Sequence, residues 1–401
     1  MQKILALESL RGLAALIVIF THFAFAFYPA MVNGPDGSVV HSRFEQLVLE
    51  SPLNLFINGQ FAVICFFVLS GFVLSYAYFT RSTDLVSAAI KRYFRLAPVA
   101  FVSVILAYFL MKFNLYQNET AALLSNSSWL QQFWQNDLGL IDALWQGILG
   151  TFVVQPTILS LNPVLWTIYY ELIGSLIVYA FLGLAGRDHR RWILYGIFML
   201  VFLNTYYIGF IIGMLLCDLF THRQEAFLKV GFWKRGYKII MLTGAILLAS
   251  YPAYLVPPAD PGIVHNSLML FTNQDLTRNI LFSLASVIFI TLLLTSNRIK
   301  TLLEQRIFVT LGSMSYSLYA THILILGSVG CALFIFFKSF MSYNLAALAT
   351  LPAFLIVAIA VAYLFRRYVD IPSISFSGYV VRKLGLGSSK IKKEDPTEAT
   401  L

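Results

Sequence analysis

The chain has 401 residues, of which 59% are hydrophobic and only 12% are charged. A soluble domain carries about 25% charged residues, so this composition excludes a soluble globular protein and indicates a multi-pass membrane protein. The net charge of +9 does not indicate nucleic-acid binding, because the basic residues gather in short loops and the tail and form no basic stripe with interleaved aromatics. Cys65, Cys217 and Cys331 all lie within apolar runs, which predicts neither a metal site nor a disulfide framework.

The first apolar run, residues 7–29, carries three ionisable side chains: Glu8, Arg11 and His22. Arg11 and His22 are eleven positions apart, about three helical turns, so they lie on one helix face about 16 Å apart along the axis. An arginine inside a spanning helix costs at least ~2.5–3.5 kcal/mol, which favours a face turned toward a water-filled cavity or a partner. In the alternative, Arg11 pairs with Glu8 and reaches the cytosolic surface, and His22 is a hydrogen-bonding residue between helices.

Nine further apolar runs are expected to span the membrane, in some cases with short helices. They cover 55–79, 96–113, 162–185, 192–203, 206–220, 239–256, 279–295, 308–337 and 344–365. Basic clusters between them predict cytosolic loops and cytosolic termini, provided that the short run 143–159 is re-entrant or interfacial. The predicted fold is therefore an all-α polytopic membrane helix bundle of about ten transmembrane helices over 1–384, with a disordered cytosolic tail over 385–401.

Several sequence blocks, in order along most of the chain, resemble acyltransferase family 3, integral-membrane acyltransferases that commonly O-acetylate surface glycans. The blocks are LESLRGLAALIVIFTHF, FFVLSGFVLS, KRYFRLAPV with its Arg-x-x-Arg spacing, NPVLWTIYYE, LGSMSYSLYATHILI and RRYVDIPSISF. Two of them depart from the family pattern. Glu171 is a single carboxylate where the family commonly has two, and Asp370 begins an Asp-Ile-Pro segment where the family often has Glu-Arg-Pro.

The resemblance implies transfer of an acetyl or other acyl group from coenzyme A to a hydroxyl group. The donor substrate would be acetyl-CoA, with no tightly bound cofactor, and the acceptor a cell-surface glycan or a lipid-linked sugar, in a bacterial inner membrane. His22 is then the expected general base. Arg11 would lie near the polar part of the donor, and Glu171 would orient His22 and stabilise its imidazolium.

Several further residues are candidates for this site, and most have both a functional and a structural interpretation. Arg92 and Arg95 are expected to bind the donor's phosphates, although positive-inside topology alone explains their position. Glu171 is alternatively a structural partner of an Arg or Tyr on another helix. His322, Tyr316 and Tyr319 share one segment and either support the site or only bond between helices, and Trp166 is expected to pack or to form a cavity wall.

A transporter or flippase is the competing function, with Arg11, His22 and Glu171 forming a pathway for a substrate or protons. No internal repeat of the kind found in transporters is apparent in the sequence. Ser70 and Gly71 are expected to permit close helix approach. His41, His189, His222 and His265 are predicted to lie in loops without a specific role.

Overall fold

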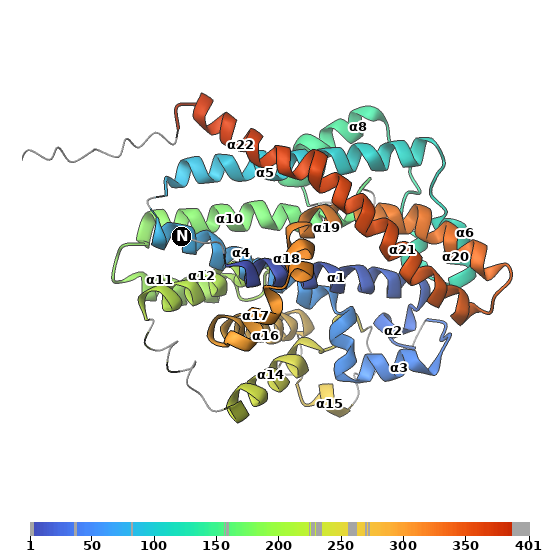
Figure 1. The fold of residues 1–401 in the computed structure, drawn as a ribbon, viewed down its shortest axis with the longest axis horizontal. Coiled ribbons are helices and arrows are strands. Elements are labelled where there is room, and N and C mark those ends of the chain that lie inside the picture. The colour runs from blue at the N-terminus through green and yellow to red at the C-terminus, as the bar shows by residue number, and fades with distance from the viewer. Residues whose placement is uncertain are drawn as a thin grey trace, which may run out of the picture.

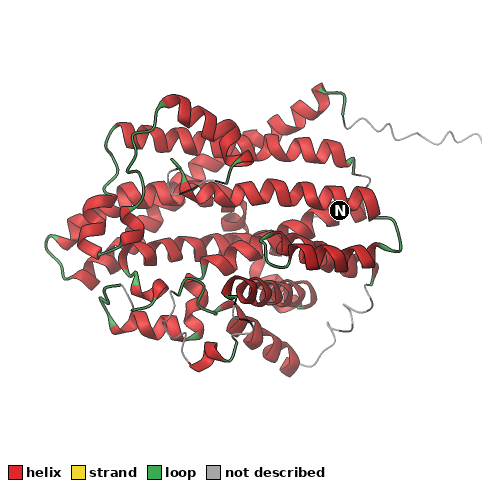
Figure 2. Ribbon diagram, turned by 180° about the vertical axis from the view of Figure 1, so that it is seen from behind, coloured by secondary structure: helices red, strands yellow, loops and turns green. Residues whose placement is uncertain are grey.

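We describe the protein from a computed structural model. It describes residues 4–386 with gaps at 36–37, 82, 156, 158–159, 224, 226–228, 230–234, 256–262, 269–270 and 272. The described part of the chain consists of helices and loops without strands (Figure 2). The predicted tail from 387 onward lies outside the described residues.

Seven helices are long and apolar enough to cross a membrane. They are α1 (Leu5–Phe27), α4 (Gly59–Thr80), α5 (Leu85–Lys112), Pro163–Ala185, which contains α10 (Trp166–Ala185), α16 (Gln274–Thr295), Ser315–Lys338 and Tyr343–Lys383. Four shorter apolar helices join them: Leu140–Val153, α11 (Arg191–Phe202), α12 (Tyr207–His222) and Gly236–Ala249, which lies in α14 (Arg235–Ala249). The protein is therefore an all-α, multi-pass membrane protein, and each of the ten predicted spans coincides with helical structure.

Several predicted boundaries were wrong, and three of them bear on the site. The third span begins at Leu85 rather than at residue 96, because Asp84 caps it by accepting a hydrogen bond from Val86 N at 3.2 Å. The span predicted over 308–337 is divided at Met314 into α18 (Arg306–Ser313) and α19 (Ser315–Ile325), which continues as the π-turn η4 (Leu326–Gly330) and α20 (Cys331–Lys338).

The last predicted span does not end at residue 365. Instead α21 (Tyr343–Phe365) continues through the π-turn η5 (Arg366–Asp370) into α22 (Ile371–Lys383). The charges at this junction have partners, since Arg366 Nε donates to Ser313 O at 3.0 Å and Asp370 is paired with Arg95. The helix can therefore continue where the sequence predicted an exposed end.

Two segments between the predicted spans, 30–54 and 114–142, contain small helices at one end of the bundle (Figure 1). The first contains α2 (Ala30–Asn33), α3 (Arg43–Glu50) and the 3₁₀ turn η1 (Pro52–Ile57), and the second contains α6 (Asn118–Ser125) and α7 (Ser128–Gln131). His41 ties the two together, because its Nε2 lies 2.9 Å from Ser125 O. We call this end outer, since the basic segments that begin α5 and follow α10 lie at the opposite end.

Glycines allow the helices that surround the centre to cross closely. A Cβ atom on Gly312 of α18 would lie 2.2 Å from Glu8 O of α1, and one on Gly71 of α4 would lie 2.1 Å from Phe210 O of α12. Neither position can hold a larger residue without moving the backbone. The prediction for Gly71 is confirmed, whereas Ser70 has a different contact, a hydrogen bond from its Oγ to Glu171 at 2.6 Å.

Among the remaining histidines, two lie in helices rather than in loops as predicted. His222 ends α12 with its Nδ1 2.8 Å from Asp218 Oδ1, and His265 is buried in α15 (Ile263–Asn266) beside Ser250 Oγ at 3.1 Å. These two contacts tie neighbouring parts of the chain together. His189 is 87% exposed.

Candidate active site

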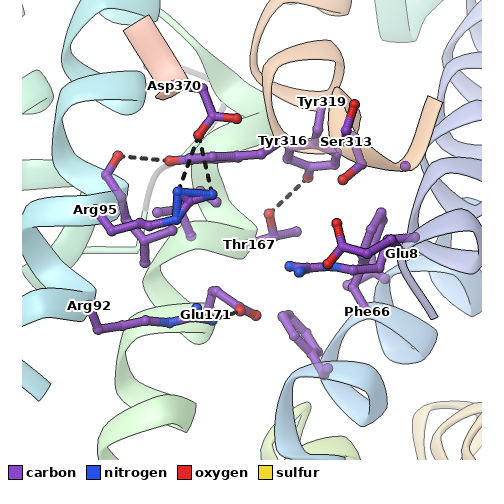
Figure 3. Close-up of a pocket in the computed structure, with 17 residues that line it drawn as sticks. Glu8, Phe66, Arg92, Arg95, Thr167, Glu171, Ser313, Tyr316, Tyr319 and Asp370 are labelled. Carbon is purple, nitrogen blue, oxygen red and sulfur yellow. Dashed lines mark hydrogen bonds and ion pairs between the residues drawn. The ribbon is translucent and has the colours of Figure 1, made fainter. Parts of the chain in front are cut away.

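Two cavities lie along the helices that carry the predicted site residues. The first, which we call the inner cavity, has a volume of about 160 Å³ and lies between α1, α4, α5, α10, α18, α19 and η5 (Figure 3). Its charged lining residues are Glu8, Arg11, Arg92, Arg95, Glu171 and Asp370. Three arginines from α1 and α5 thus share one cavity with three carboxylates.

Two of the arginines are paired with these carboxylates. Arg92 forms an ion pair with Glu171 and donates from Nε to Ser175 Oγ at 3.0 Å. Arg95 Nη2 lies 3.2 Å from Asp370 Oδ1 (Figure 3). The α5 arginines therefore lie at the cavity itself, held in place by partners on α10 and η5.

Arg11 is different from these two. Its Nε is buried without a hydrogen-bond partner, and its guanidinium forms no hydrogen bond or ion pair with any residue that the structure describes. The alternative in which Arg11 pairs with Glu8 is therefore wrong. Arg11 is half-buried and its guanidinium has hydrogen-bonding capacity that the described residues do not use, so Arg11 is the group in the inner cavity best able to take up an anion.

Glu171 does not contact His22, although the sequence led us to expect that it would orient this histidine. Its carboxylate is bound by Arg92 from α5 and by Ser70 from α4. The rotation of α10 about its axis, which packing sets, turns Glu171 toward α5. Glu171 thus belongs to the charged wall of the inner cavity.

His22 lines a second cavity of about 550 Å³, which we call the outer cavity. Its lining comes from α1, α7, α19 and the segment that leads into α10, and consists of His22, Trp129, Gln132, Phe133, Gln155, Thr157, Pro163, Val164, Trp166 and Ile323. Trp129 stacks on His22 with ring centroids 5.2 Å apart and on Phe25 at 5.1 Å. The aromatic ring of α7 thereby fixes the plane of the histidine.

The partner of His22 is His322. His22 Nδ1 lies 2.7 Å from His322 Nε2, and His322 Nδ1 lies 2.7 Å from Tyr319 O. A carbonyl oxygen only accepts hydrogen bonds, so Nδ1 of His322 carries a proton, and neutral His322 accepts at Nε2. His22 therefore donates from Nδ1, which leaves the lone pair on its own Nε2 free. This is the tautomer that a general base needs.

A thin wall separates the two cavities. Trp166 lines the outer cavity and the next residue, Thr167, lines the inner one. Thr167 Oγ1 donates to Tyr319 Oη at 2.9 Å (Figure 3). Tyr319 Oη in turn donates to Val164 O at 2.8 Å. Tyr319 thus faces the inner cavity, one helical turn from His322, which contacts His22 of the outer cavity.

The other predicted residues divide between the same two cavities. Tyr316 lines the inner cavity and donates from Oη to Leu96 O at 2.8 Å, and Trp166 forms part of the outer wall, as expected. Asp370 and Thr167 also line the inner cavity, although neither was predicted as a site residue. Asp370 gave one signal, an acid at the end of a long apolar run. Within the described residues, no three His, Cys, Asp or Glu side chains gather where they could hold a metal ion.

A comparison with protein families complements this geometry. Residues 4–367 match the family model described as an acyltransferase domain, Acyl_transf_3. The chain belongs to acyltransferase family 3. Searches among curated proteins and among solved structures found no match. The protein is thus a membrane acyltransferase, which favours an enzyme over a transporter or flippase.

Proposed function

We propose that the protein moves an acyl group, in the first instance acetyl, from coenzyme A in the inner cavity to a hydroxyl in the outer cavity. The observation that supports this proposal is the placement of Arg11 in the lining of the inner cavity and of His22, whose Nε2 is free, in the lining of the outer one. Both residues lie on α1, eleven positions apart. The helix places them about 16 Å apart along its axis, a distance that an extended pantetheine arm can cover.

The inner cavity would bind the donor through its arginines. A guanidinium group binds phosphate oxygens with two parallel hydrogen bonds, and Arg11 has no competing partner among the described residues. Arg92 and Arg95 contribute after exchange of their carboxylate partners, or bind the donor with their remaining N–H groups. Because the basic segments lie at this end of the bundle, the donor would enter from the cytosol.

The reaction would use His22 as general base. Its Nε2 takes the proton of the acceptor hydroxyl as the oxygen attacks the carbonyl carbon of the thioester. The carbon–sulfur bond breaks, the acyl group remains on the acceptor oxygen, and the thiolate of coenzyme A leaves. The imidazolium then returns its proton to that thiolate. His322 supports the cycle, because its Nε2 accepts a stronger hydrogen bond from Nδ1–H when His22 is charged.

The acceptor that we propose is a hydroxyl of a cell-surface glycan or of a lipid-linked sugar. The outer cavity opens among the small helices at the end opposite the basic segments, which suits an acceptor outside the cytosol. We further propose that the protein resides in a bacterial inner membrane with both termini cytosolic, in agreement with the distribution of basic residues.

The test is acyl transfer by the purified protein in lipid nanodiscs, with acetyl-CoA labelled in the acetyl group. The wild type should consume the thioester and label a glycoside acceptor. His22→Ala should lose at least about 100-fold of this rate, since general-base catalysis contributes about 10²–10⁴-fold. His189→Ala, which changes an exposed histidine, is the control. Wild-type transfer by His22→Ala, with both variants folded, would refute the role of His22.

A further inference from the structure

The outer cavity differs from the inner cavity in its charge. None of its described lining residues is an Asp, Glu, Lys or Arg, and His22 is the single titratable group among them. The undescribed positions between Gln155 and Ser160 are Pro156, Ile158 and Leu159, so the sequence adds no charge there. The inner cavity, by contrast, has six Arg, Asp and Glu side chains in its lining.

Two kinds of group line the outer cavity instead. Trp129, Phe133 and Trp166 contribute aromatic rings, and Gln132 and Gln155 contribute side-chain amides. A sugar ring has matching surfaces, because its C–H bonds pack against aromatic faces while its hydroxyls bond with amides.

Several polar groups of this lining are available for a ligand. Within the described residues the indole N–H groups of Trp129 and Trp166 have no acceptor, whereas that of Trp134, outside the cavity, donates to Leu161 O at 2.9 Å. The side-chain amide of Gln132 also has no hydrogen-bond partner among the described residues. Gln155 accepts one long bond, from Tyr170 Oη at 3.4 Å. These groups form a set of hydrogen-bond donors and acceptors around His22.

We infer that the outer cavity binds an uncharged sugar ring of the acceptor and that this neutral lining determines specificity. The inference rests on the proposed function and adds to it the charge of the acceptor ring and the residues that select it. Trp129 and Trp166 pack against the ring, Gln132 and Gln155 bond to its hydroxyls, and one hydroxyl meets His22 Nε2. Carboxylates or phosphates of a larger acceptor lie outside the cavity, because its described lining residues include no Lys or Arg that could pair with an anion.

The test compares matched acceptors with the full-length protein in nanodiscs. The panel consists of p-nitrophenyl glycosides of glucose, galactose, mannose and N-acetylglucosamine, with the uronides of glucose and galactose, which carry a carboxylate at C6. At least one neutral glycoside should be acetylated, with kcat/KM at least about tenfold above that of its uronide, because an uncompensated carboxylate costs more than about 1.4 kcal/mol.

Variants of Gln132 test the location. Gln132→Lys should move the preference toward the uronide by at least about fivefold through the new cation, and Trp166→Leu should raise KM for the glycoside while leaving KM for acetyl-CoA unchanged. Gln131→Lys makes the same change at an exposed neighbour and should alter neither ratio. An effect on folding would act on both acceptors equally, so the change in ratio is specific to binding.

The outcomes separate this inference from the proposed function. Equal acetylation of glycoside and uronide, or an unchanged ratio in Gln132→Lys, overturns the inference while acyl transfer stands. Thioester hydrolysis that depends on His22, with no transfer to any neutral glycoside, also overturns the inference alone. If acetyl-CoA is neither hydrolysed nor used for transfer, the proposed function falls and the inference falls with it.

Discussion

The contact between His22 and His322 leads to a quantitative prediction for His322→Leu. This substitution removes the acceptor of the His22 Nδ1–H group, which now lies 2.7 Å from His322 Nε2. A buried donor left without a partner costs about 1–3 kcal/mol. His22 can regain that free energy by turning its ring or exchanging its tautomer, and either change removes the lone pair at Nε2 from the acceptor. If this whole free energy is needed to return His22 to its productive orientation, it adds to the activation barrier and kcat falls by about 5–150-fold.

The assay is acetyl transfer with kcat and KM measured for each substrate. KM for acetyl-CoA should be unchanged, because His322 is not among the residues that line the inner cavity. His322→Gln keeps an oxygen acceptor and should restore at least part of kcat. Thermal unfolding of both variants serves as the folding control. Wild-type kcat in a folded His322→Leu protein, or equal losses in the Leu and Gln variants, would refute the positioning of His22 by His322.

Three further predictions concern other parts of the molecule. Gly312→Ala should lower Tm and expression, because the new Cβ would lie 2.2 Å from Glu8 O and force α1 and α18 apart. Arg11→Gln should raise KM for acetyl-CoA by about tenfold or more, the effect of losing one charge-assisted contact of about 1.5–3 kcal/mol. Asp218→Asn should destabilise the protein by about 3–5 kcal/mol, because the fully buried carboxylate binds Arg191 through Nε at 2.6 Å.

Each of these predictions has its own control. Gly244→Ala meets no atom within 4 Å and should keep the wild-type Tm; an equal loss in both glycine variants would contradict the crossing argument. Arg11→Gln should leave KM for the glycoside unchanged, and a rise there instead would move Arg11 away from the donor. Asp218→Asn should lower Tm with little change in KM for either substrate, and an unchanged Tm would contradict the role of that ion pair.

Much of the fold could be predicted, because apolar runs near 20 residues directly indicate the helices that can cross a membrane. The rise per residue of the first helix also predicted how far apart Arg11 and His22 lie along the helix axis. Arg11 lines the inner cavity and His22 the outer one, which agrees with their predicted separation by about three turns on one helix face. That agreement follows from helix geometry alone, since both residues share one rigid element.

The contacts between helices could not be predicted in the same way. His22 and His322 are 300 positions apart, and no local period indicates which residues of two distant helices meet. The rotation of α10 decides that Glu171 turns to Arg92 rather than to His22, and this rotation depends on packing against α4 and α5. Asp370 was predicted to lie beyond the exposed end of the last span. It is instead buried beside Arg95, a partner 275 positions away that no local sequence pattern indicates.

The central claim, that donor and acceptor meet from opposite sides of the membrane, is tested most directly in sealed proteoliposomes of known orientation. Labelled acetyl-CoA is supplied at the cytosolic face and a membrane-impermeant neutral glycoside at the outer face, and then the two are exchanged. The account predicts acetylated glycoside in the first arrangement, no product in the exchanged one, and loss of product in His22→Ala. Product that forms only when donor and acceptor are on the same side would contradict the account.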